Sequence, residues 1–183
     1  MSAFQANDES SILSARTRIE PLETSELASF CYNDIMQKHP LTQEEFDLIF
    51  GKVPRLTVEV AVRTDDGLVM TKIPKGPMKG QWNVPGGTVR FNEKLVDAAK
   101  RVAKSELGID VTIGENLGYI EYPELLAAGE RSWPVGMVFE ATIISGKLTK
   151  SDEGEAVECF RRVPENTIPS QARFFNDYLQ KIY

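Results

Sequence analysis

The chain has 183 residues, of which 42% are hydrophobic and 26% charged, and its formal net charge is −6. A chain of this length has room for one domain with a real core and an appended segment. The acidic balance excludes bulk binding to nucleic acid or to an anionic membrane, which calls for basic patches. It does not exclude a small phosphate ligand, because a few local lysines are enough to bind one.

Targeting signals and cysteine usage indicate a compartment. The two cysteines, Cys31 and Cys159, lie far apart and form no redox-type or metal-type spacing,. The first residues, MSAFQANDESS, contain acids and no apolar core of a secretory signal,. No apolar run approaches the roughly 20 residues that span a bilayer. We therefore expect a cytoplasmic protein that does not enter a membrane.

The N-terminal part of the chain predicts helices. Residues 1 to about 20 are polar and aperiodic, whereas residues 24–38 place apolar side chains at helical spacing,. Thr42 and Glu45 form a capping box before a second helix that ends near Gly51,. These patterns predict a partly disordered helical arm over residues 1–52 and a second domain over residues 53–183. We expect the arm to mediate a homodimer.

Beyond residue 55 the periodicity changes to that of strands. Residues 56–63 alternate, Asp65-Asp66-Gly67 signals a turn, and residues 68–73 return as the second strand of a hairpin,. A loop rich in proline and glycine follows, and Asn92 is the expected N-cap of a helix that ends before Gly108. The remaining runs predict a short strand at 82–84, strands at 111–114, 117–122, 135–144 and 157–163, and a helix at 169–182. This order predicts an α/β fold: a mixed sheet with helices on both faces.

Between the hairpin and the next strand lies a spaced motif. The motif consists of residues at fixed spacing in a predicted loop and helix: Gly87, Glu93, Arg101, Glu106 and Gly108. An aliphatic residue follows Gly108. This spacing resembles the Nudix box, G-x5-E-x7-R-E-U-x-E-E-x-G-U with U aliphatic, and the resemblance extends over about residues 53–183. It implies a Nudix fold.

The resemblance also implies roles for the residues that match. Glu106 and the backbone carbonyl of Gly86 would ligate a divalent metal, and the pair Glu93 and Arg101 would brace the loop against the helix. The opposing interpretation of Glu106 is a solvated surface acid, which is the usual state of a lone glutamate.

Where the fuller box has two further carboxylates, this chain has Val102 and Ser105. Positions 102, 105 and 106 are related by three and four residues, so we expect them to share one helical face. The acidic loop at 152–155 offers replacements, because many Nudix proteins place a metal-binding or water-binding glutamate there. Glu155, and after it Glu153, are therefore the candidates that would complete a site for one Mg²⁺ or Mn²⁺, unless the loop is only a solvated turn.

A narrower resemblance is to the GDP-mannose mannosyl hydrolase branch of the family. That branch has a similarly thinned box ending like Ser105-Glu106-Leu107-Gly108, and a short helical segment like QEEF at 43–46. It uses a histidine base in the loop matched here by residues 152–155, whereas the single histidine of this chain is His39. The usual histidine mechanism is therefore not available.

Basic and aromatic residues around the motif suggest a ligand. Lys72, Lys75 and Lys79 precede the box and Arg90 follows its glycines, so each is a candidate for phosphate binding or is simply solvated,. Tyr122 is a candidate for stacking on a base, with core packing as the alternative. Together these features predict a hydrolase of a small-molecule nucleotide, a nucleoside diphosphate linked to another group, with a nucleotide sugar favoured. The alternative is a Nudix-fold module that binds such a ligand without turnover.

Overall fold

The structure is a computed structural model that describes residues 41–149 and 156–181. The helix expected at 24–38, the candidates Glu153 and Glu155, and the end of the helix expected at 169–182 lie outside these residues. The described helices are α2 (Gln43–Phe50), α3 (Leu95–Leu107), α4 (Pro123–Ala127) and α5 (Pro169–Gln180). The strands are β1 (Arg55–Thr64), β2 (Gly67–Lys72), β3 (Trp82–Asn83), β4 (Gly86–Thr88), β5 (Asp110–Glu121), β6 (Pro134–Ser145) and β7 (Val157–Phe160).

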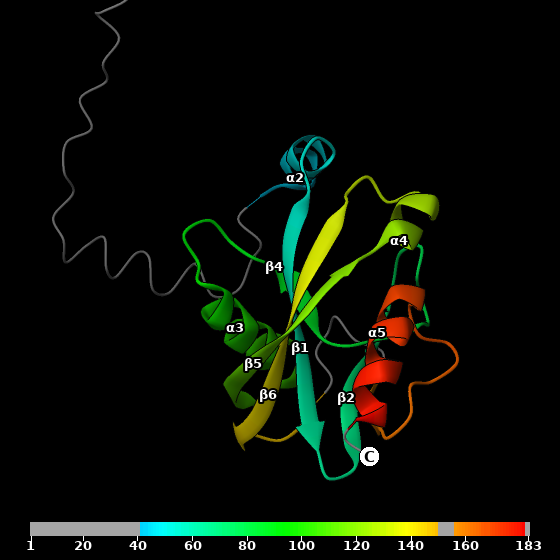
Figure 1. The fold of residues 1–183 in the computed structure, drawn as a ribbon. Coiled ribbons are helices and arrows are strands. Elements are labelled where there is room, and N and C mark those ends of the chain that lie inside the picture. Colours follow the sequence, from blue (N-terminus) through cyan, green and yellow to red (C-terminus); the bar gives the residue numbers. More distant parts are fainter. Residues whose placement is uncertain (1–40, 150–155, 182–183) are drawn as a thin grey trace, which may run out of the picture. The chain divides into compact units, whose positions relative to one another are not determined.

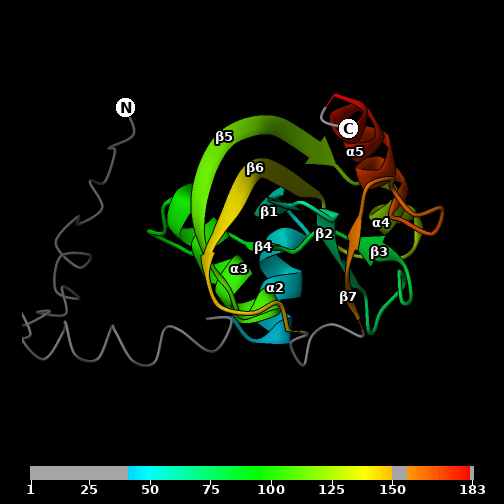
Figure 2. The same ribbon diagram turned by 90° about the horizontal axis from the view of Figure 1, so that it is seen from below.

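These strands form one mixed sheet, as the sequence predicts. Its order is β3-β2-β1-β6-β5, with β4 paired to β1 and β7 paired to β2. β1 runs parallel to β6 and antiparallel to both β2 and β4. Figure 1 shows α3 on one side of the strands and α5 on the other, and Figure 2 shows the long curved pair of β5 and β6. The mixed α/β architecture is confirmed.

The two faces of β1 pack into two different hydrophobic cores. Val58, Val60 and Val62 belong to the core beneath α3. Ala61 belongs to the other core, which includes Phe175 and other residues of α5. Residues of one strand alternate between the faces of a sheet, so this division follows from the strand geometry. Because helices cover both faces, the alternation in β1 does not mark a solvent-exposed side.

The cap of α2 is formed by the residues that the sequence predicts. The Thr42 side chain accepts a hydrogen bond from the backbone N–H of Glu45 at 3.3 Å. In return Glu45 Oε2 accepts from the backbone N–H of Thr42 at 2.8 Å. This reciprocal pair satisfies two donors that the first helical turn leaves free. The helix ends at Gly51, also as predicted.

The start of α3 differs from the prediction. Lys94 is its N-cap, while Asn92 lies in the loop with a φ of 61°. The reason is Glu93, whose backbone N–H donates to Arg90 O and whose carboxylate accepts from Arg90 N–H, forming a tight turn before the helix. At the other end Gly108 has a φ of 73°, the left-handed conformation expected of a glycine that ends a helix,.

Three further boundaries depend on tertiary contacts. The runs at 111–114 and 117–122 are one strand, β5, interrupted by register shifts against β6. β7 ends at Phe160 instead of continuing to residue 163. The short elements β4 and α4 have too few residues to produce a periodic signal. The helices in the described ranges are too short or too polar to span a lipid bilayer.

Candidate active site

A partly buried ion pair holds the loop that leads into α3. Arg101 Nε lies 2.6 Å from Glu93 Oε1, and Arg101 Nη2 donates to Glu93 Oε2 at 2.8 Å. Arg101 Nη2 also donates to the backbone carbonyl of Thr88 at 3.0 Å. Each side chain of the pair is 15% exposed. The arginine therefore ties the strand β4, the loop and the helix into one unit, which is the bracing role predicted for it.

The same arginine sets the charge state of its partner. Burial raises the pKa of Glu93, but hydrogen bonds from Arg101 and Arg90 and their positive charges outweigh burial and hold that pKa below its usual value. Glu93 is thus an ionised structural carboxylate, committed to the loop. Burial, followed by the charge of Arg101, lowers the pKa of Arg90, which remains a cation beside the box.

We expect Arg101→Lys to lower the free energy of unfolding by about 2 kcal/mol, because lysine keeps the charge but not the forked hydrogen bonds. Urea unfolding checks this value. Arg63→Lys is the matched control, since Arg63 forms a half-exposed pair with Glu140 at 3.3 Å and an exposed pair contributes little,. Equal losses in both variants would contradict a special role for Arg101.

The glycine pair brings β4 close to its neighbours. A Cβ on Gly87 would lie 2.9 Å from a methyl group of Val102 on α3. A Cβ on Gly86 would overlap the carboxylate of Glu59 on β1. Neither contact leaves room for a side chain. The box glycines are therefore required where backbone is pressed between the helix and the sheet.

The three positions expected to share a face of α3 lie in different environments. Val102 is 1% exposed and packs in the core, whereas Ser105 is exposed and Glu106 is half-buried. Their spacing along one side of the helix does not make all three accessible, because Val102 fills the space beneath Gly87. Only positions 105 and 106 are therefore available to a ligand.

The described residues offer few side-chain ligands for a metal ion. Residues 41–149 and 156–181 contain no group of three or more histidine, cysteine, aspartate or glutamate side chains placed to hold one. Mg²⁺, however, is commonly held by one or two carboxylates, with water and substrate phosphate in the other positions. Glu106 is one such carboxylate, and its role as a metal ligand together with the Gly86 carbonyl stays a prediction.

The candidate phosphate-binding residues are spread around the loop before the box. Lys75 and Lys79 are exposed. Lys72 ends β2 with its ammonium group 5.8 Å from the centre of the Trp82 ring, a distance typical of a cation–π contact,. Arg90 is half-buried at the loop after β4. The structure thus commits Lys72 partly to Trp82 and leaves Lys75 and Lys79 in solvent.

Sequence reasoning missed a buried carboxylate on the opposite face of the sheet from α3. Glu59 lies in the middle of β1, 6% exposed, and lines a cavity of about 200 Å³. We call this the Glu59 cavity. Its wall also includes β4 with the glycines that open the box, and residues of β1, β3, β6 and of α4 and α5 with their N-caps: Arg55, Thr57, Asn83, Gly86, Gly87, Thr88, Tyr122, Leu125, Pro134, Ile168 and Gln171.

A hydrogen-bond network fixes the carboxylate of Glu59. Thr57 Oγ1 donates to Glu59 Oε1 at 3.1 Å, and Gln171 Nε2 lies 3.4 Å from Oε2. Gln171 also donates to Tyr122 Oη at 3.1 Å, and its Oε1 accepts from the backbone N–H of Val84 at 2.8 Å. Tyr122, a candidate for stacking, is 3% exposed and belongs to this network. Its hydroxyl, and little of its ring, can meet a ligand.

The environment of Glu59 changes its acidity. Burial raises its pKa to about 7, and hydrogen bonds from Tyr122 and Thr57 and the charge of Arg55 oppose that rise. One signal could have identified this residue, since Glu59 is the single acid in the strand and lies between two valines. The alternation of the strand predicts a hairpin but not which element covers each face, and α5 covers the face of Glu59.

We expect the metal-free protein to lose about 3 kcal/mol of stability between pH 4.5 and pH 7 on account of Glu59. Its pKa is higher folded than unfolded, so the folded state retains a proton that the unfolded state has lost in this window. Urea unfolding across this range checks the slope. Glu59→Gln should flatten the curve, and an unchanged slope in that variant would show that Glu59 does not titrate there.

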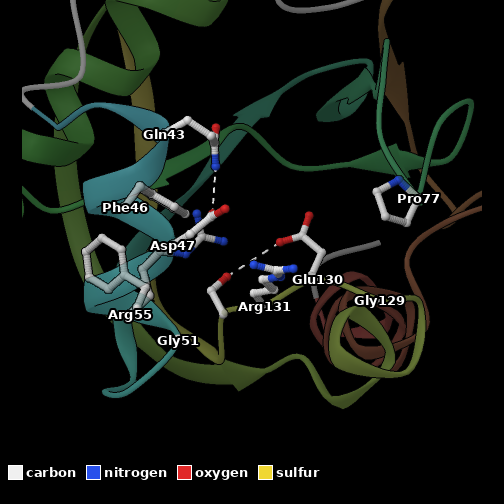
Figure 3. A pocket seen from close by; sticks show the side chains of 11 residues that line it. Gln43, Phe46, Asp47, Gly51, Arg55, Pro77, Gly129, Glu130 and Arg131 are labelled. Atoms are coloured by element: carbon white, nitrogen blue, oxygen red, sulfur yellow. Dashed lines mark hydrogen bonds between the residues drawn. The ribbon is translucent and has the colours of Figure 1, made fainter.

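Arg55 connects the Glu59 cavity with a second cavity of about 440 Å³ beside α2. Figure 3 shows Gln43, Phe46 and Asp47 of α2 on one side of this cavity and Glu130 and Arg131 on the other. The Arg55 guanidinium carbon lies 5.2 Å from the centre of the Phe46 ring. The helix α2 therefore holds a cation that borders both cavities.

Comparisons with known proteins agree with this geometry. A family model described as NUDIX domain matches residues 53–179. A low-salt glycan biosynthesis protein, Agl8, of Haloferax volcanii is 42% identical over 82 residues, 45% of this chain and 53% of that protein. The match thus spans about half the length of that relative. An ADP-ribose pyrophosphatase of Methanocaldococcus jannaschii is 26% identical over 131 residues, 69% of this chain and 74% of that protein.

Solved structures give the same result for the fold. The crystal structure of a MutT NUDIX hydrolase from Burkholderia pseudomallei aligns with a TM-score of 0.61 and 25% identity. The alignment covers 72% of this chain and 99% of that one. The shared part therefore includes nearly all of that chain.

Proposed function

This chain belongs to the NUDIX domain family, and from that premise we propose that it hydrolyses a nucleoside diphosphate linked to another group, with a nucleotide sugar as the favoured substrate. The observation that carries the proposal is the intact brace of the box, in which Arg101 joins Glu93 and the carbonyl of Thr88. This brace joins β4, which carries Gly86, to α3, which carries Glu106, although two box carboxylates are replaced.

Two relatives support the choice of substrate. One is named an ADP-ribose pyrophosphatase, and ADP-ribose is a nucleoside diphosphate linked to a sugar. The other is named a glycan biosynthesis protein, and it is 42% identical over a stretch of 82 residues. Both names point to a sugar-linked substrate for this chain.

Each candidate residue has its own role in such a reaction. Glu106 and the Gly86 carbonyl would hold the cation, and Mg²⁺ or Mn²⁺ bound there would neutralise the diphosphate charge. Arg90, Lys75 and Lys79 attract the phosphates as additional positive charges. A carboxylate, for which Glu155 and then Glu153 are the candidates, accepts the proton of the attacking water.

A second function is supported by the thinned box. Val102 is buried and Ser105 is neutral, so Glu106 is the single acidic side chain among the three positions of α3. A chain with this replacement could bind a nucleotide ligand through the same cavities without turning it over. The alternative proposal is therefore a ligand-binding Nudix module.

One screen separates the two proposals. The full chain is incubated with nucleoside diphosphate sugars, ADP-ribose and dinucleotides, each with Mg²⁺ or Mn²⁺, and products are separated by ion-exchange chromatography. Turnover supports the hydrolase; a rise in melting temperature without product supports the binding module. Hydrolysis in ¹⁸O-labelled water then identifies whether the C–O or the P–O bond breaks.

We also propose that α2 contributes to a homodimer. None of its residues is buried, and Leu48 and Ile49 expose 60% and 41% of their surface. Val53 and Leu56, which follow the helix, are 50% and 43% exposed. A second chain would cover such an apolar surface.

A further inference from the structure

We propose that the Glu59 cavity is the subsite for the sugar ring of the substrate, with Glu59 and Arg55 as the residues that select its hydroxyl groups. This inference rests on the proposed function and goes beyond it, because it assigns a place and a recognition chemistry to the group beyond the diphosphate. Four properties of the cavity carry it.

The first property is position. Gly86, Gly87 and Thr88, which open the box, form part of the wall of the Glu59 cavity. A diphosphate held at the Gly86 carbonyl therefore lies at the mouth of this cavity. The group that enters the cavity must be one bonded directly to a phosphate. In a nucleotide sugar the sugar ring and the ribose are both bonded to a phosphate, whereas the base is separated from it by the ribose, so the position favours a sugar over the base.

The second property is the pairing of an acceptor with a donor. Thr57 and Gln171 approach different oxygens of Glu59 and Tyr122 is a third hydrogen-bond partner, whereas a carboxylate has about four acceptor positions,. Arg55 Nε is buried without a hydrogen-bond partner among the described residues. Two neighbouring hydroxyl groups satisfy both, since one donates to Glu59 and the other accepts from Arg55. Binding would thus satisfy a buried donor that otherwise has a cost.

The third property is size and lining. The volume of about 200 Å³ is below the roughly 300–1,000 Å³ of sites that hold whole drug-sized ligands, so one ring fits,. Tyr122 is the single aromatic residue in the described wall, and it is 3% exposed. A nucleobase usually stacks on an aromatic face, which this wall does not present. A polar sugar ring matches the wall better than a base does.

The fourth property is that the cavity is built in advance. On the neighbouring strands, Gly86 of β4 pairs with Glu59, and Gly136 of β6 pairs with Thr57, two residues before it. A Cβ at Gly136 would lie 2.6 Å from Glu59 Oε1, so both glycines are needed to leave the carboxylate in place. Gln171 is held by Val84, and Arg55 is held over Phe46. The recognising groups therefore need little rearrangement on binding.

The test compares ligands with and without the sugar. Dissociation constants for GDP-mannose, UDP-glucose and ADP-ribose, and for GDP, UDP and ADP alone, are measured by calorimetry with Mn²⁺ on the full chain and on Glu59→Gln. We expect Glu59→Gln to weaken at least one sugar-linked ligand by tenfold or more and to change its bare nucleoside diphosphate by less than twofold. Gly136→Ala should produce the same selective loss, and Gly114→Ala is its control, because a Cβ there meets only ordinary contacts.

Two results would overturn the inference: equal losses for sugar-linked and bare ligands, which would place the base or the ribose in the cavity, or no loss for either. The readout is binding, so it is independent of turnover. Selective loss of sugar binding in a chain that hydrolyses nothing would refute the hydrolase and retain this subsite. If the natural chain hydrolyses a substrate and Glu59→Gln keeps the same preference for sugar-linked over bare ligands, the hydrolase is supported and this subsite is refuted.

Discussion

We expect Glu106→Gln to reduce hydrolysis of the substrate by on the order of 100-fold, which corresponds to about 3 kcal/mol of transition-state stabilisation. Glutamine keeps the shape of the side chain and removes the negative charge that binds the cation. Mn²⁺ affinity should fall with activity, and the melting temperature should change by no more than a few degrees. Steady-state kinetics and Mn²⁺ titration monitored by electron paramagnetic resonance measure the two effects.

Asp97→Asn is the matched control for this prediction. Asp97 is exposed in the first turn of the same helix, so the substitution removes one charge from α3 at the end away from Glu106. Activity within twofold of the natural chain is expected for this variant. Full activity in Glu106→Gln would show that Glu106 is not a metal ligand. The pair of Glu93 and Arg101 would then have no metal ligand on α3 to position.

The second large effect concerns the two replaced positions of the box. We expect Val102→Glu to lower the free energy of unfolding by about 4 kcal/mol, because it forces a charged group into a core position. Val102 is 1% exposed beneath Gly87. Ser105→Glu, at an exposed position, should change stability by less than about 0.5 kcal/mol. Urea unfolding of both variants measures the difference.

The same pair of variants tests the location of the metal. Ser105→Glu adds a carboxylate next to Glu106, and a second charge near the cation should tighten Mn²⁺ binding about fivefold, or by roughly 1 kcal/mol. If Mn²⁺ affinity does not change, the end of α3 does not face the cation. If Val102→Glu is as stable as the natural chain, the packing of the helix under the glycine pair is wrong.

Local patterns in the sequence were sufficient for much of the fold. The hairpin of β1 and β2, the capping box of α2 and the glycine that ends α3 depend on residues within a few positions of one another. The box also could be recognised, since Glu93 and Arg101 are separated by one loop and two helical turns. Each of these features is determined by backbone geometry and short-range hydrogen bonds, which the order of residues specifies directly.

Tertiary structure alone decided which polar residues are buried and where they meet. Glu59 and Gln171 are 112 residues apart and become neighbours because α5 packs on one face of β1. Val102 and Glu106 are one helical turn apart. Val102 is nevertheless buried, because it contacts the glycine pair, and the helix by itself does not determine this. The burial of a side chain depends on which element covers it, and that element can come from any part of the chain. The sequence by itself therefore determined the Nudix box and the brace, and the packing of α5 and β4 against β1 created the cavity beside them.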